Sequence, residues 1–260
     1  WIKVPTIVLT AAALWWFDGA LAIGVAAAVM TLGTGILMAV VVHPNATLWT
    51  KTRWRGDSNS VALTFDDGPD PAATLKIAEI LADHKIRAAF FVVGERTRAH
   101  PEIVAKLHEA GHLVCNHSDT HAPHFHFSLW GTVRRELRAC NEAIASVIGA
   151  EPTLFRSPQG IKNPALGDVL REMDMTAVGW QVRGLDSLGD DPDAIERRIL
   201  RGVAPGGVIM LHDGTGLGGR SDRSATIEAL PRIIDGLRSR GLQFARLDEL
   251  LGVEPYRAAS

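Results

Sequence analysis

The chain of 260 residues contains one tyrosine and two cysteines, and its basic residues do not outnumber its acidic ones. Two cysteines cannot build a disulfide framework, so we expect Cys115 and Cys140 to be buried free thiols, with a single bridge as the alternative. With 27 basic and 29 acidic residues, the net charge is -2, without the basic excess that is typical of nucleic-acid-binding proteins. The hydrophobic share of 47% excludes a wholly disordered chain.

Charge is also missing from the N-terminal region. Between Val4 and Val42 the only charged residue is Asp18, and the stretch from Ala20 to Val42 has none. At about 1.5 Å per residue, that stretch is long enough to cross a hydrocarbon core of ~30 Å. It is also longer than the apolar core of a cleaved signal peptide. We therefore expect residues 1–43 to form a transmembrane helical region.

Two arrangements fit this region. One is a helical hairpin with its turn at Asp18-Gly19, and the other is a single span preceded by an interfacial segment around Trp15 and Trp16. Small residues recur every four positions at Ala20, Gly24 and Ala28, which suits close helix packing and favours the hairpin.

The rest of the chain has the composition of a soluble domain. Residues 44–60 are interpreted as a juxtamembrane connector, and residues 61–250 as one catalytic domain. Short apolar runs predict strands at 61–65, 88–93, 112–116, 153–156, 176–182, 207–212 and 243–247. Helical patterns lie between them near 72–83, 101–110, 128–148, 164–172, 192–200 and 223–240. This alternation predicts an α/β fold with parallel strands, either a barrel or an open sheet.

Polar clusters follow the predicted strands. They are TFDDG (64–68), HSDTH (117–121), RSPQG (156–160), the segment around Asp186, and LHD (211–213). In a barrel of parallel strands, the carboxyl ends of the strands meet on one face. Two histidines four residues apart and one carboxylate make a plausible three-ligand site for Zn²⁺ or a similar ion, with a coordination position left for water. A second carboxylate as general base and a further histidine as acid complete the groups needed for amide or ester hydrolysis.

These motifs, in this order, resemble the NodB-homology domain of the polysaccharide deacetylases, carbohydrate esterase family 4. The resemblance covers roughly residues 57 to 250. It implies a distorted (β/α) barrel of about seven strands, one divalent metal ion that is usually zinc, with cobalt or another divalent ion possible, and removal of N-acetyl groups from amino sugars. The chain would then be a metal-dependent hydrolase acting on an N-acetylated glycan.

The resemblance assigns the roles of the strongest motifs. Asp66 matches the catalytic base, and Asp67, His117 and His121 match the metal ligands. Arg156 matches the arginine that orients the base.

The remaining positions carry the acid and the substrate pocket. His212 matches the general acid, Asp186 the carboxylate that tunes it, and Ile209 an apolar position three residues before it. Gln159 stands where the family usually has tyrosine, whose backbone N–H helps to bind the oxyanion, and Trp180 is expected to wall the pocket.

The fourth motif departs from the family. Arg183 and Ser187 stand where the family usually has aspartate and tryptophan, which puts the substrate in question more than the chemistry. The alternatives are a deacetylase or deformylase of a lipid-linked sugar or glycolipid, and a degenerate module that only binds glycan.

We expect a protein anchored in the bacterial cytoplasmic (inner) membrane. Lys51, Arg53 and Arg55 follow the apolar region, and the positive-inside rule places them in the cytoplasm. The family resemblance instead implies envelope glycans on the outer side. The expected partners are the membrane and an N-acetylated glycan or lipid-linked sugar, and no nucleic acid.

Overall fold

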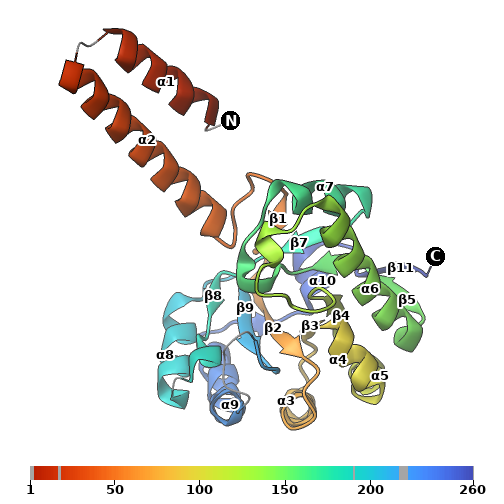
Figure 1. Ribbon diagram of the computed structural model, residues 1–260. Coiled ribbons are helices and arrows are strands. Elements are labelled where there is room, and N and C mark those ends of the chain that lie inside the picture. The colour runs from red at the N-terminus through yellow and green to blue at the C-terminus, as the bar shows by residue number, and fades with distance from the viewer. Residues whose placement is uncertain (1–2, 17–18, 190, 217–221, 260) are drawn as a thin grey trace.

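The computed structural model describes residues 3–16, 19–189, 191–216 and 222–259. Two helices extend from a domain in which helices surround a curled sheet (Figure 1). The helices are α1 (Lys3–Trp16), α2 (Gly19–Val42), α3 (Thr74–Asp83), α4 (Gly94–Ala99), α5 (Pro101–Glu109), α6 (Trp130–Ile148), α7 (Pro164–Glu172), α8 (Pro192–Gly202), α9 (Ser224–Ser239) and α10 (Leu247–Leu251). Three short 3₁₀ turns are η1 (Phe125–Phe127), η2 (Pro158–Gly160) and η3 (Asp186–Leu188).

The main sheet is parallel throughout. Its strands are β1 (Thr52–Arg53), β2 (Ser60–Gly68), β3 (Ala89–Val92), β4 (Leu113–Asn116), β6 (Leu154–Phe155), β7 (Thr176–Val178), β8 (Val182–Arg183), β9 (Val208–His212) and β10 (Gln243–Phe244). Their order is β1-β7-β6-β4-β3-β2-β9-β8, with β10 beside the first residues of β2. The curled parallel sheet with its outer helices confirms the predicted distorted (β/α) barrel.

Each of the seven predicted strands overlaps an observed one, with β2 extending beyond its prediction at both ends, and the sheet gains two further strands of two residues. One of these, β1, comes from the segment that the sequence suggests is a connector, and it pairs with β7. The other, β8, adds to β9 at the far end of the sheet. The helix starts follow ordinary capping chemistry. Asn163 and Asp191 accept a hydrogen bond from the first turns of α7 and α8, and each precedes a proline at the first helical position.

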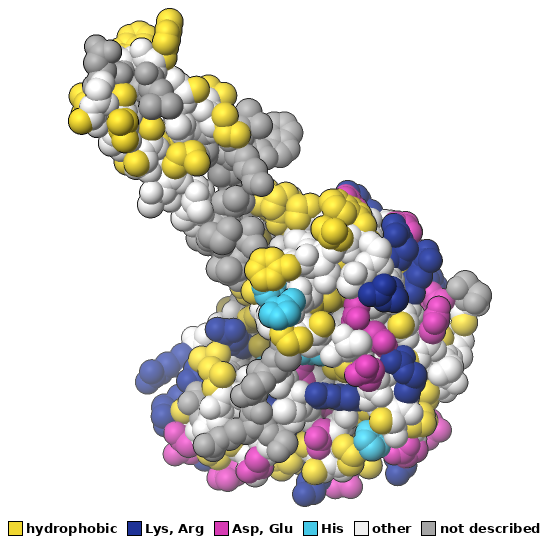
Figure 2. Space-filling view, in the orientation of Figure 1, with side chains coloured by type: hydrophobic (Ala, Val, Ile, Leu, Met, Phe, Trp, Pro, Cys, Tyr) yellow, Lys and Arg dark blue, Asp and Glu magenta, His cyan; other side chains and the backbone are white. Residues whose placement is uncertain are grey.

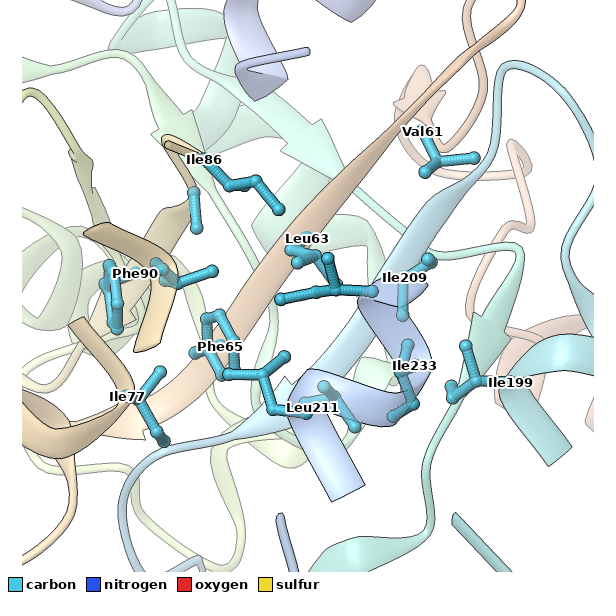
Figure 3. Packing of buried hydrophobic residues seen from close by; sticks show 14 of the residues in the cluster. Val61, Leu63, Phe65, Ile77, Ile86, Phe90, Ile199, Ile209, Leu211 and Ile233 are labelled. Atoms are coloured by element: carbon cyan, nitrogen blue, oxygen red, sulfur yellow. The ribbon is translucent and has the colours of Figure 1, made fainter. Parts of the chain in front are cut away.

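Side chains alternate between the two faces of each strand, and this divides the hydrophobic core into an outer cluster and an inner cluster. Leu63 and Phe65 on β2, and Ile209 and Leu211 on β9, face the helices and pack with residues such as Ile233 of α9 (Figure 3). The intervening residues face the interior of the barrel, where Ala62 and Met210 join a second cluster. Asp66 lies four residues after Ala62 and His212 lies two residues after Met210, so both side chains also point toward the interior of the barrel.

The N-terminal helices lie side by side, as the hairpin interpretation predicts (Figure 1). The predicted turn at Asp18 lies outside the described residues. Within the part of the chain that the structure describes, α2 alone is long and apolar enough to cross a membrane, over Gly19–Ile36. Its side chains are largely exposed, including Ile23 at 67% and Leu32 at 67%.

The single tyrosine closes the C-terminal end of the fold. Tyr256 begins β11 (Tyr256–Ala258), which pairs antiparallel with β5 (Ala150–Pro152) in a separate small sheet. Its hydroxyl accepts a hydrogen bond of 2.9 Å from the backbone N–H of Val114 on β4. Both cysteines are free and buried, as predicted.

Candidate metal centre and active site

Three potential metal ligands converge at the carboxyl ends of β2 and β4. The Oδ1 atom of Asp67 lies 3.3 Å from Nε2 of His117 and 3.1 Å from Nε2 of His121. All three residues are buried, and one ligand atom from each lies within 4.8 Å of the others. The structure thus brings together the ligand set that the sequence predicts, at separations compatible with one ion.

The hydrogen bonds around these groups fit a metal ligand set. The Nδ1 atom of His117 lies 2.8 Å from the carbonyl oxygen of Arg156, and a proton on Nδ1 donated to that oxygen leaves the Nε2 lone pair free. The Oδ1 atom of Asp67 is buried and lacks a hydrogen-bond partner among the described residues. Burial opposes ionisation of Asp67, but the two histidines outweigh it and hold the pKa of its carboxyl well below the usual value.

The backbone is forced into unusual conformations to make this cluster. Asp67, Ser118 and His121 all have positive φ, at 73°, 68° and 49°. A buried side chain stabilises residues 117–121, here called the histidine loop. The carboxylate of Glu136 accepts hydrogen bonds from the backbone N–H groups of Asp119 and Thr120, at 3.1 Å and 2.9 Å. The loop therefore aims both imidazoles at Asp67.

Asp66 forms a buried ion pair beside the ligands. Its Oδ1 atom accepts a hydrogen bond of 2.6 Å from Nη1 of Arg156, which also donates to the hydroxyl of Thr64 at 2.8 Å. The guanidinium lies over the ring of Phe91, 4.1 Å from its centre, and donates to the carbonyl of Gly179 at 3.1 Å. These contacts fix the Asp66 carboxylate in one orientation.

A second pair lies at the end of β9. The Nδ1 atom of His212 is 2.9 Å from Oδ1 of Asp186, and the backbone N–H of His212 donates to Oδ2 at 2.8 Å. Thr226 also donates to Oδ2 at 2.8 Å. Burial favours neutral His212, but the negative charge and hydrogen bonds of Asp186 outweigh it and raise the histidine pKa to about 9. The imidazole is therefore protonated at neutral pH, and its Nε2–H is available as a proton donor.

Asp66, His212 and the three potential metal ligands line one cavity of about 270 Å³, and Arg156 and Asp186 support this lining through Asp66 and His212. Gln159 and Trp180, expected at the substrate pocket, both line it. Gln159 has φ of 60°, a further positive value at the site. Ile209 does not reach the cavity: its side chain faces the helices in the outer core (Figure 3), and its neighbour Met210 lines the cavity instead.

Comparisons with known proteins agree with this geometry. The family model described as "Polysaccharide deacetylase" matches residues 54–178. A chitooligosaccharide deacetylase of Rhizobium leguminosarum bv. trifolii is 34% identical over 207 residues, covering 74% of this chain and 92% of that protein. The chain belongs to the polysaccharide deacetylase family.

Two solved structures share the fold of this polysaccharide deacetylase family member. One is the Bc1960 peptidoglycan N-acetylglucosamine deacetylase in complex with 4-naphthalen-1-yl-N-oxidanyl-benzamide. Its TM-score is 0.74 at 30% identity, with 79% of this chain and 95% of that chain covered. The other is a family 4 carbohydrate esterase from Streptomyces lividans in complex with acetate. Its TM-score is 0.67 at 31% identity, with coverage of 79% and 100%.

The structure of this polysaccharide deacetylase family member adds site residues that the sequence reasoning missed. Thr226 supports Asp186, and Asp213 lies buried beside the site with its Oδ2 atom 2.6 Å from the hydroxyl of Thr74. Burial raises the pKa of Asp213 to about 7. Asp213 stands in the LHD motif, which was a usable signal, whereas nothing local in the sequence marks Thr226.

The segment before the domain also reaches the site. The side chain of Asn45 pairs with the backbone of Trp180 through two hydrogen bonds, donating to its carbonyl at 2.8 Å and accepting from its N–H at 3.1 Å. Pro44 lies against Gly160, where an added Cβ atom would come within 3.2 Å of the proline Cβ and 2.5 Å of the Trp180 ring. Residues just after α2 thus support one wall of the cavity.

Proposed function

We propose that the protein is a metal-dependent hydrolase that removes N-acetyl groups from an amino sugar in a polysaccharide or glycoconjugate. The observation that carries this proposal is that one cavity is lined by Asp66, which Arg156 holds, by His212, which Asp186 holds, and by the three ligand residues. Family membership and the names of the relatives support the same reaction class.

The ligand set proposed for the metal is Asp67, His117 and His121. Two imidazoles and one carboxylate suit zinc, and cobalt or another divalent ion is the alternative. When bound, such an ion supplies Lewis acidity, which lowers the pKa of water and polarises an acyl oxygen.

The protein groups then handle the protons. Asp66 accepts a proton from the water that attacks the acetyl carbon, and Arg156 holds the carboxylate in position for that transfer. The backbone N–H of Gln159 is proposed to donate to the oxygen of the acetyl group as negative charge develops there. His212 donates its Nε2 proton to the amine nitrogen as the carbon–nitrogen bond breaks, and acetate and a free amine leave.

The direct test is acetate release from a short N-acetylglucosamine oligomer by the full-length protein in detergent, loaded with zinc. The wild type is expected to release acetate, and Asp66→Asn to release none while retaining one metal ion per chain, because the three ligands remain. A surface change, Asp193→Asn, is the matched control. Loss of metal from Asp66→Asn would contradict the assigned role, and sugar binding without acetate release by the wild type would favour the glycan-binding module.

A second candidate substrate is a lipid-linked sugar or glycolipid, from which the same centre would remove an acetyl or formyl group. Arg183 favours it. This residue lines the cavity and is exposed, and its side chain has no ion pair or hydrogen bond within the described part of the chain. A guanidinium in that position suits a phosphate or carboxylate on the substrate. Comparing wild type and Arg183→Gln on a lipid-linked phosphosugar and on the neutral oligomer separates the candidates. A selective loss on the phosphosugar supports the second.

The protein is proposed to be anchored in the bacterial cytoplasmic membrane through α2, with residues 1–43 as the anchor, 44–60 as the connector and 61–250 as the catalytic domain. The exposed apolar surface of α2 supports this division. Flotation of the full-length protein with vesicles, retained after a high-salt wash, tests it.

A further inference from the structure

The catalytic domain exposes large apolar side chains near the end of α2. Phe127, Leu129 and Trp130, here called the apolar rim, are 76%, 69% and 44% exposed. Figure 2 shows hydrophobic side chains gathered where the helical pair joins the domain, whereas charged side chains cover much of the rest of the visible face. Contiguous exposed apolar side chains of this size mark a contact surface.

Hydrogen bonds connect the apolar rim to the residues that directly follow α2. The side-chain amide of Asn163 donates to the carbonyls of His126 and Ser128, both at 2.9 Å, and these residues flank Phe127. The neighbouring Lys162 donates through Nζ to the carbonyl of Pro44. One short segment, 162–163, therefore holds both the rim and the chain leaving α2.

The rim cannot lie far from the end of the helix. Helix α2 ends at Val42, two residues before Pro44. At about 3.5 Å per extended residue, Pro44 lies at most ~7 Å beyond the helix end. If hydrocarbon surrounds the exposed apolar side chains of α2, the membrane surface passes close to this point.

The rim has the chemistry of an interfacial surface. Trp130 donates from its indole N–H to Asp168 at 2.7 Å while part of its ring stays exposed, which gives it one polar and one apolar end. Aromatic side chains of this kind are enriched at the membrane–water boundary. The exposed Lys51, nine residues after the end of α2, adds a cation that suits anionic headgroups.

We propose that the apolar rim docks into the surface of the bilayer that α2 crosses. Because Asn45 and Pro44 support the cavity wall at Trp180 and Gly160, the same contact holds the cavity close to the lipid surface. Resting on the proposed function, this makes the substrate an amino sugar presented at the membrane surface, by a lipid linkage or by glycan lying against the bilayer.

The test places an environment-sensitive fluorophore on the full-length protein in vesicles of phosphatidylcholine and phosphatidylglycerol. Phe127→Cys and Leu129→Cys carry the label on the rim. Ile23→Cys on α2 is the positive control, and Glu79→Cys on α3, at the end of the domain away from α2 (Figure 1), is the aqueous control. Unmodified protein treated with the same reagent gives the background, since both native cysteines are buried.

We expect spin-labelled lipid to quench the fluorophores at 127 and 129 to an extent approaching that at 23, and to leave the fluorophore at 79 unquenched. Quenching at 127 and 129 by aqueous iodide, to the level at 79, would overturn the proposal. Protection from both quenchers that is lost on dilution of the protein would show that a second copy covers the rim, and would overturn it too.

Exposure of position 23 to iodide would show that α2 is not inserted, which removes the basis of the docking. Failure of the proposed deacetylation is a separate result, because it is read as acetate release and not as fluorescence.

Discussion

Asp186→Asn tests the electrostatic pairing at the acid end of the cavity. The change keeps the shape of the side chain and an oxygen that can accept from Nδ1 of His212, but removes the negative charge. The pKa of His212 is about 9 with Asp186 in place, against an ordinary value of 6.5. That difference corresponds to about 3 kcal/mol in favour of the imidazolium. Without the charge, burial lowers the histidine pKa from about 9 toward the ordinary 6.5, while the carboxylates of Asp67 and Asp66 still favour the imidazolium.

The sign of the effect follows from the acid role proposed for His212. The imidazolium is the competent form, so activity is present below the pKa and falls as the pH rises through it. At pH 8, His212 is about nine-tenths protonated in the wild type, and would be ~3% protonated in a variant with the ordinary pKa of 6.5. We therefore expect a loss of up to ~30-fold in kcat/KM at pH 8, shrinking toward pH 6.

The assay is the pH profile of kcat/KM for acetate release from the N-acetylglucosamine oligomer, with Asp193→Asn on the exposed side of α8 as the control. The alkaline limb is expected to move down by as much as ~2.5 pH units in Asp186→Asn and to stay in place in the control. A metal ion bound to both the wild type and Asp186→Asn affects the pH profiles of both. The difference between the two profiles therefore still reports the loss of the Asp186 charge. A uniform loss at all pH values, with the limb unmoved, would refute the reasoning.

Further predictions concern stability and the metal. Arg156→Met leaves the Asp66 carboxylate buried without its partner and should lower the free energy of unfolding by about 3–5 kcal/mol; thermal melting measures it, with the exposed Arg135→Met as a control expected to melt like the wild type. In metal-free protein, the melting temperature of Asp213→Asn relative to that of the wild type should rise steadily from pH 5 to pH 8. The folded pKa of Asp213, about 7, lies above its ordinary 3.8, so wild-type stability falls over that range, by about 2–3 kcal/mol by pH 8. A constant difference in melting temperature would contradict it. His117→Gln should lose zinc and acetate release together, and elemental analysis that finds full metal occupancy would argue against this ligand.

The sequence predicted those parts of the site that depend on strand ends. Asp66, Asp67 and His212 follow directly from runs of buried apolar residues, and parallel strands bring such positions to one face. His117 and His121 follow β4 in the same way. Because these contacts are set by the sheet, the order of the motifs along the chain was enough to place them together.

The prediction for Ile209 neglected a signal that the sequence contained. Residues 209 and 212 are three apart on one strand, so their side chains point to opposite faces, whereas Met210 shares the face of His212. The pairing of Asn45 with Trp180 is different in kind. The two residues are 135 positions apart, and no local pattern in a single sequence specifies a contact over that separation.

The scarcity of tyrosine gives this fold a single-site reporter. Tyr256 is the one tyrosine in the chain, and its hydroxyl contacts β4 two residues before the end of the strand that leads into the histidine loop. Biosynthetic replacement with a fluorinated tyrosine would therefore yield one fluorine resonance, free of overlap. That resonance would register release of the C-terminal strand from the sheet, and would allow its motion to be followed while the seven tryptophans report on other parts of the molecule.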